Sequence, residues 1–263
     1  LAGTQRSLSS NFEKLSSGLR INNAADDAAG LGISERLKAG IRSLAQAERN
    51  AMDGVSLIQT AEGAMNEISG ILVRMRELAV QSANGTLGSV DRSFIQGEFG
   101  QLRSEIDRIA VVTQYNGNRL MDTVTTSVSF QVGVNNSTND RIAVTLNSLH
   151  SSALGTPAAA DVQDISLQYV TGAQNALAIL DNAINDVSQQ RATLGAVQNR
   201  LQVTVTNLAS ARENLTAANS RIRDVDVASE TAALTRNSIL MQAGVSVLAQ
   251  ANQLPAMALS LMQ

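Results

Sequence analysis

The chain carries two long ladders of apolar residues with a spacing of seven, one toward each end. The C-terminal ladder consists of Leu180, Val187, Leu194, Leu201, Leu208, Leu215 and Ile222. The N-terminal ladder consists of Leu37, Leu44, Ala51, Ile58, Met65, Leu72 and Ala79. A repeat of seven sustained over this length keeps an apolar seam along one side of an α-helix. Because such a helix cannot bury its seam alone, we expect the two ladders to pack along each other.

This pattern predicts a mainly α fold, a long antiparallel helical bundle or coiled coil built from both chain ends. The residues expected to pack its interior are Leu37, Leu44, Ile58, Met65, Leu72, Leu180, Val187, Leu194, Leu201, Leu208, Leu215 and Ile222. Smaller signals predict where the helices begin and end. Asp26 or Asp27 suits the N-cap of a helix over about 28–82, and Asn84-Gly85 ends it. Ser89 suits the cap of a second helix.

The middle of the chain changes its period from about four to two. Val128, Phe130, Val132 and Val134 alternate with polar residues, and so do Ile142, Val144 and Leu146. This predicts a small β-hairpin over about 124–146 with a polar loop at 135–140. Residues 147–164 are small and polar and include Pro157, which is typical of an irregular connector. The second ladder then predicts a helix over about 165–223, and a last helix begins near Ser229.

The two chain ends carry short, narrow apolar stripes that predict helices used in assembly. The residues assigned to these terminal assembly helices are Leu8, Phe12, Leu15, Leu19, Val245, Leu248, Leu259 and Leu261. Ordering a backbone costs about 1–2 kcal/mol per residue, and such stripes alone cannot offset that cost. Neighbouring copies would supply the missing apolar surface. We therefore expect the ends to be disordered in the monomer and to fold on assembly.

Composition narrows the function classes. The net charge of −3 argues against nucleic acid as a partner. The chain has no Cys, which removes disulfides, thiolate catalysis and Cys-based metal sites. Its one histidine, His150, lies in connector sequence and is expected to be a solvated loop residue. No catalytic, metal-binding or cofactor-binding residue is predicted, and an enzyme is disfavoured. No apolar run approaches the length of a membrane span.

Six stretches, in order along the chain, resemble bacterial flagellin. They are KLSSGLRINNAADDAAGLGISERL at 14–37, RMRELAVQSANG at 74–85, TQYNGNRL at 113–120, LGAVQNRL at 194–201, SRIRDVDVA at 220–228 and SVLAQANQLP at 246–255. The resemblance implies a short form without large outer insert domains and with the extreme N-terminus cut short. It assigns residues 1–27 to the inner tube domain and spacer, 28–223 to a rod-like helical domain with the hairpin and connector, and 224–263 to the C-terminal part of the tube.

The resemblance also implies partners and a location. The chain would be a homo-oligomeric subunit of a helical filament for swimming motility, secreted by type III export and placed outside the cell. A flagellar export chaperone and a filament cap are implied as partners. A further implied partner is a Toll-like innate immune receptor, for which the matching positions are Arg74, Leu78, Glu98, Leu180 and Ile184. The position before Arg74 is often Gln in well-recognised members, and here it is Val73.

Two other readings stay open at this point. A hook–filament junction protein shares the terminal helices with flagellin, although the complete RMRELAVQSANG and SVLAQANQ stretches favour flagellin. A secreted helical surface adhesin, or another binding module, could use the polar loop at 135–140 to recognise glycans or receptors.

Overall fold

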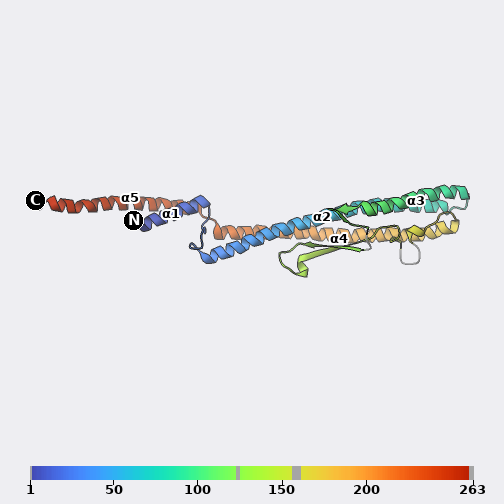
Figure 1. The fold of residues 1–263 in the computed structure, drawn as a ribbon, viewed down its shortest axis with the longest axis horizontal. Helices are drawn as coiled ribbons and strands as arrows, with labels where there is room; N and C mark the ends of the chain where they lie inside the picture. Colours follow the sequence, from blue (N-terminus) through green and yellow to red (C-terminus); the bar gives the residue numbers. More distant parts are fainter. Residues whose placement is uncertain (1, 123–124, 156–160, 261–263) are drawn as a thin grey trace. The chain divides into compact units, whose positions relative to one another are not determined.

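The computed structural model describes residues 2–122, 125–155 and 161–260, with the backbone alone for 125 and 252–260. It confirms the mainly α fold with small antiparallel strand pairs in the middle (Figure 1). The helices are α1 Ala2–Ser17, α2 Ala28–Ser82, α3 Ser89–Val112, α4 Val170–Arg223 and α5 Val227–Ser260. The strands are β1 Gln114–Tyr115, β2 Asn118–Arg119, β3 Thr125–Gln131 and β4 Arg141–Asn147, with short 3₁₀ turns at Thr138–Asp140 and Val162–Asp164.

The chain divides into two compact units, and both long helices pass through each of them. Unit 1 comprises Leu1–Ser43 with Ser210–Gln263, and unit 2 comprises Leu44–Ala209. The domains predicted to end at residues 27 and 223 concern the tube and the rod of a filament. These two units do not test that division, which stays a prediction.

Unit 2 contains an apolar core between α2, α3, α4 and the hairpin (Figure 1). Helices α2 and α4 run antiparallel, as the contact of Gly54 with Leu201 and the ion pair of Arg76 with Asp181 require. The ladder residues within this unit are buried: Leu44, Ala51, Ile58, Met65, Leu72, Ala79, Leu180, Val187, Leu194, Leu201 and Leu208. The heptad pattern therefore identified the interior of unit 2, while Leu37, Leu215 and Ile222 in unit 1 are half-buried.

The helix ends follow local chemistry. Asp27 Oδ1 accepts the Gly30 N–H at 2.8 Å and so caps α2, which spans the predicted residues. Asp26 accepts the N–H groups of Asn23 and Asn22, and these bonds lower the pKa of its carboxyl. The prediction of Ser89 as a cap was wrong by one residue. Gly88 is the N-cap of α3, and its N–H donates to Asp91 Oδ2 at 3.0 Å.

The predicted hairpin forms as β3 and β4, with Phe130 opposite Ile142 and Val128 opposite Val144. Side chains of β4 alternate between buried and exposed, as a strand packed on one face requires. The ring of Phe130 lies over Gly54 of α2, where an added Cβ would approach its Cγ to 3.1 Å. The hairpin thus lies directly against the helical core.

The described part of the connector at 147–164 is irregular, as predicted, but it is not simply polar. Leu149, Leu154 and Val162 are buried and belong to the core of unit 2. Residues 156–160 lie outside the described part of the chain.

Helix α4 begins at Val170, five residues later than predicted. The reason lies in the contacts of Leu167, whose N–H donates to Gln96 Oε1 at 2.6 Å and whose carbonyl accepts from Ser82 Oγ at 2.6 Å. Side chains of α2 and α3 thereby hold the backbone of Leu167 outside the helix.

In unit 1, α1 lies along α5 (Figure 1). The residues that follow α1 form backbone hydrogen bonds with the residues between α4 and α5 and at the end of α4. Leu19 forms an antiparallel bridge with Asp224, the Arg20 N–H donates to the Arg223 carbonyl at 2.6 Å, and Val225 N–H donates to Gly18. Among the described residues of unit 1, Ile21 is the one apolar side chain that is buried. The described residues of unit 1 therefore form backbone bonds between segments but no apolar core of their own.

Candidate assembly interface

Helices α1 and α5 meet along a narrow seam whose residues follow spacings of four and three. On α1 the residues covered from solvent along this seam are Thr4, Leu8, Asn11 and Leu15. On α5 they are Glu230, Leu234, Asn237, Met241 and Gly244. This spacing is that of two helices paired along one seam each. Of the residues assigned to assembly, Leu8 and Leu15 therefore face α5, and Leu19 lies in the bridge to Asp224.

Phe12 does not lie in this seam, contrary to its place in the predicted stripe. Its side chain is 58% exposed, whereas the next residue toward the N-terminus, Asn11, is 8% exposed. Adjacent helix positions point about 100° apart, so a seam that takes Asn11 must turn Phe12 outward. The one aromatic side chain of α1 is therefore uncovered on the subunit.

Helix α5 presents a further set of uncovered apolar residues. Val245 and Leu248, both assigned to assembly from the sequence, are exposed, and so are Ile239, Leu240 and Val247. The side chain of Leu259 and all of Leu261 lie outside the described part of the chain. Exposed apolar residues in this number on one helix indicate a surface that another molecule covers.

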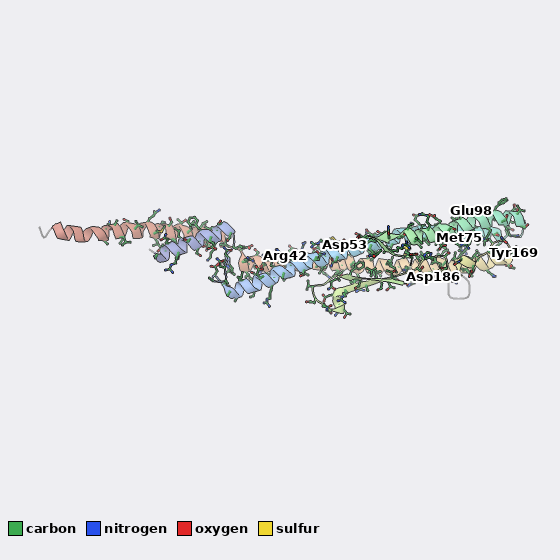
Figure 2. The ribbon with its side chains drawn as sticks, in the orientation of Figure 1. Arg42, Asp53, Met75, Glu98, Tyr169 and Asp186 are labelled. Carbon is green, nitrogen blue, oxygen red and sulfur yellow. The ribbon has the colours of Figure 1, made fainter. Side chains whose placement is uncertain are left out.

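Of the residues implied for receptor contact, some lie on the surface of unit 2 and others lie in its core. Arg74 is exposed and pairs with Glu77 and with Glu98 of α3, each at 2.9 Å. These hydrogen bonds raise the pKa of Arg74 above its ordinary value. Figure 2 labels Glu98 on α3 and also Met75, which is fully buried in unit 2.

Leu78 and Leu180 are 1% and 0% exposed. Their assignment to a contact surface therefore does not fit the folded subunit, in which they pack the core. The sequence placed both on apolar ladders or beside them, and that pattern already indicated burial. Ile184 is half-buried.

The expectation of a solvated His150 was wrong. Its Nε2 lies 2.9 Å from Asp122 Oδ1 and its Nδ1 lies 3.3 Å from Asp107 Oδ1 of α3. Burial lowers the pKa of His150, but the hydrogen bonds to Asp122 and Asp107 raise it, and the net direction is upward. Ser151 binds Asp107 through both its N–H and its Oγ. His150 and Ser151 thereby fasten the connector to α3.

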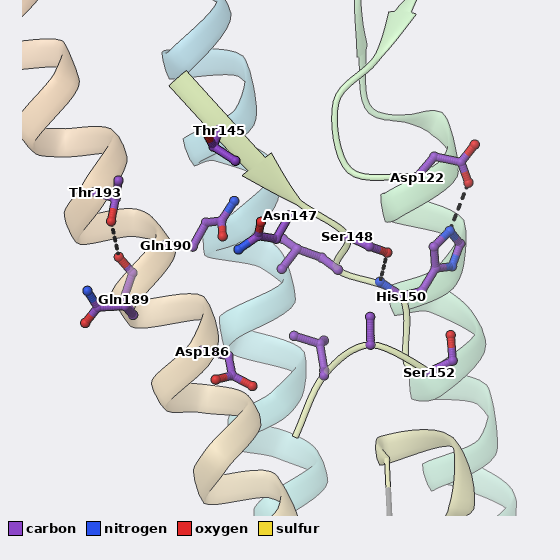
Figure 3. A pocket seen from close by; sticks show the side chains of 13 residues that line it. Asp122, Thr145, Asn147, Ser148, His150, Ser152, Asp186, Gln189, Gln190 and Thr193 are labelled. Atoms are coloured by element: carbon purple, nitrogen blue, oxygen red, sulfur yellow. Dashed lines mark hydrogen bonds and ion pairs between the residues drawn. The ribbon is translucent and has the colours of Figure 1, made fainter. Parts of the chain in front are cut away.

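His150 borders a pocket of about 880 Å³ beside α4 (Figure 3). Its polar walls include Asn147, Asp186, Gln189 and Gln190. Asp186 accepts the Gly155 N–H at 3.1 Å, and Asp122 is already bound to His150 and Arg119. These acidic groups therefore serve the attachment of the connector.

Within the described ranges, no cluster of three or more side chains suited to a metal ion is found. No helix in the same ranges has the length and apolar character needed to span a membrane.

Two family models and the relatives in sequence point to one family. Residues 1–126 match the bacterial flagellin N-terminal helical region, and residues 177–262 match the bacterial flagellin C-terminal helical region. A flagellin of Halalkalibacterium halodurans is 51% identical over 252 residues, which cover 96% of this chain and 90% of that protein. The flagellar filament 33 kDa core protein of Treponema phagedenis is 45% identical over a match that covers 100% of this chain and 95% of that protein. The crystal structure of Bacillus cereus flagellin superposes with a TM-score of 0.51 at 34% identity, over 65% of this chain and 94% of that one.

Proposed function

Since the chain belongs to the bacterial flagellin family, we propose that it is a structural subunit of a flagellar filament used for swimming motility. The observation that carries this proposal is the contrast between the two units. Unit 2 closes a core around its apolar ladders, whereas unit 1 leaves Phe12 and the outer apolar side chains of α5 uncovered. Family membership and the uncovered surface together favour a subunit completed by its neighbours.

The physical mechanism follows from the shortage of buried surface in unit 1. Burying apolar area stabilises by about 25 cal/mol per Å², and a seam as narrow as that between α1 and α5 supplies little of it. A neighbouring copy that covers Phe12, Val245 and Leu248 would add the missing area. Such contacts must join different surfaces of two copies, because head-to-tail contacts extend an open helix while a symmetric contact closes a dimer.

Growth on filament seeds, followed by electron microscopy, tests the proposal. Purified full-length chain should elongate seeds into long filaments. A hook–filament junction protein would stop after a short ring, and an adhesin would leave the seeds unchanged. Relatives at 45–51% identity are flagellins and filament core proteins, which disfavours both alternatives.

We also propose that the chain is secreted by type III export and that it binds a flagellar export chaperone and a filament cap. Their support is membership of the flagellin family, since every copy of an external filament must leave the cell before it is added. In a strain without a functional export apparatus, we expect the protein to be missing from the culture medium. Unchanged secretion in that strain would contradict this route.

We also propose that the outer face of α2 and α3 contacts a Toll-like innate immune receptor, with Arg74 and Glu98 as its charged centre and Ile184 of α4 as a further contact. The support is the exposure of Arg74 and Glu98 and the ion pair that joins them at 2.9 Å. Arg74→Ala should lower signalling in a receptor assay. Arg108→Ala, which removes an arginine of similar exposure that pairs with Glu105, is the matched control. Signalling by Arg74→Ala equal to that of the parent would remove this residue from the proposed contact.

A further inference from the structure

One buried position on the apolar seam of α4 carries a glutamine. The buried residues of this stretch follow spacings of three and four: Leu180, Ala183, Val187, Gln190, Leu194 and Val197. Gln190 is 8% exposed, and its Nε2 has no hydrogen-bond partner among the described residues. An amide donor that is buried and unpaired costs stability, and a leucine here would avoid that cost. The glutamine therefore calls for a role outside the packing of the subunit.

The side chain of Gln190 lies on the wall of the pocket beside α4 (Figure 3). This pocket measures about 880 Å³ and lies between α4, the end of β4 and the first residues of the connector. A volume of this size falls within the range of small-molecule sites. The last bond of a glutamine side chain rotates easily, so the donor can turn toward the cavity. An occupant of the pocket would supply the acceptor that Gln190 lacks.

Other polar groups of the wall are also available to an occupant. Thr145, Asn147 and Gln189 are exposed, and within the described ranges their side chains form no hydrogen bond. Asp186 accepts the Gly155 N–H through Oδ2 at 3.1 Å, and its Oδ1 has no partner in the same ranges. Donors and acceptors thus converge on the pocket from both β4 and α4.

These groups define the chemistry of the occupant, which must accept from Gln190 and donate to Asp186. A hydroxyl group does both, because it carries one donor and two acceptor lone pairs. The amide side chains of the wall bind a hydroxyl in either direction. The charges at the rim are already paired, since Asp122 binds both His150 and Arg119. The wall therefore suits a neutral ligand with several hydroxyl groups.

We propose that this pocket binds a neutral sugar, one or two saccharide units in size, with Gln190 as its central donor. The apolar lining residues are Leu149, Ala153 and Leu154, which offer little surface to the side chains of a peptide. All lining residues belong to unit 2, whose core is closed in a single copy. Sugar binding is therefore a second function of the subunit, separate from its proposed place in a filament.

Saturation-transfer NMR, which observes the ligand and uses dilute protein, tests the proposal on the full-length subunit. The probes are glucose, galactose and N-acetylglucosamine, added separately, and a capped tetra-alanine peptide as the comparison. At least one sugar should receive saturation, with a Kd on the order of 1 mM, as expected for a small neutral ligand held by a few hydrogen bonds. The peptide should receive none.

Variants of the wall locate the binding. Gln190→Leu should weaken it by roughly tenfold, about the contribution of one hydrogen bond, while the thermal midpoint stays equal or rises because the unpaired donor is gone. Asn147→Ala changes an exposed residue, so it should weaken binding with the fold intact. Gln202→Leu, at an exposed position of α4 outside the pocket, is the matched control and should bind as the parent does.

Three results would overturn the proposal. The first is no saturation of any of the three sugars at about 10 mM, which is roughly ten times the expected Kd. The second is an unchanged affinity in both Gln190→Leu and Asn147→Ala, which would place the sugar elsewhere on the chain. The third is a signal for the peptide that exceeds that of every sugar. None of these results bears on the filament function, which growth on seeds tests separately.

Discussion

Replacing Phe12 by Ala should weaken filament growth while leaving the fold of the subunit intact. The side chain of Phe12 is 58% exposed and makes little contribution to the isolated chain. Alanine also has the higher helix propensity, so α1 should not be weakened locally. A surface substitution of this kind usually changes the free energy of unfolding by less than about 0.5 kcal/mol.

The effect on assembly follows from the area that a neighbour would cover. A phenylalanine side chain presents about 200 Å², of which the 58% still exposed is about 115 Å². At about 25 cal/mol per Å², full coverage is worth about 3 kcal/mol. Alanine would retain part of this, so the loss is about 2 kcal/mol, or roughly 30-fold in the equilibrium constant for adding one subunit.

The assay is the concentration of subunit that remains unassembled when growth on seeds has stopped. Phe12→Ala should raise it by roughly 30-fold, with the urea midpoint of unit 2 unchanged. Ser16→Ala, at an exposed polar position on the same helix, should change neither quantity. Leu201→Ala provides the opposite control. Leu201 is fully buried, and its truncation should cost about 2–5 kcal/mol in the free energy of unfolding.

If Phe12→Ala leaves the residual subunit concentration within about twofold of the parent, Phe12 is not an assembly contact, since that range is smaller than about 0.5 kcal/mol. A urea midpoint lowered as much as by Leu201→Ala would contradict the assembly role as well. Phe12 would then belong to the fold of the subunit and not to its contact with a neighbour.

Three further substitutions test contacts within unit 2. Ser82→Ala removes the fully buried donor to the Leu167 carbonyl and should cost about 1–3 kcal/mol in urea unfolding, and no loss would show that this bond does not hold the start of α4. Gly117→Ala forces a side chain at a φ of 80° in the turn between β1 and β2, so unfolding should become easier by about 1–2 kcal/mol. His150 has a pKa raised above 6.5, so its stabilising contribution is complete below about pH 6.5 and is lost as the pH rises through the raised value. Replacement of His150 by Gln should therefore flatten the fall in unfolding free energy above pH 6.5, and an unchanged slope would contradict the role of its bond to Asp122.

Patterns with local causes were predictable from the sequence. The ends of α2 follow from Asp27 and from Asn84-Gly85, both of which act within one turn. The β3–β4 hairpin follows from strict alternation, and the turn at Asn116-Gly117 takes positive φ at both residues, as this dipeptide favours. The buried ladders of unit 2 follow from the heptad spacing alone.

Features set by distant partners were not predictable in the same way. Asn11 is buried in the seam and Phe12 is exposed because of the way α1 packs on α5. The spacing of residues within α1 does not show which of its faces contacts α5. The late start of α4 depends on Gln96 and Ser82, which lie far from Leu167 in the sequence. His150 was expected in solvent because its neighbours are polar, whereas its partners come from α3 and from the segment after β2.

We propose that other copies of the chain complete unit 1. Amide hydrogen exchange, compared between dilute subunit and filament, tests it most directly. We expect fast exchange across α1 and across α5 from Ile239 onward in the dilute subunit, and slow exchange of both in the filament. The buried stretches of α2 and α4 in unit 2 should exchange slowly in both states, because their core is already closed. Strong protection of α1 and α5 in the dilute subunit, unchanged on assembly, would show that unit 1 is already complete in a single copy.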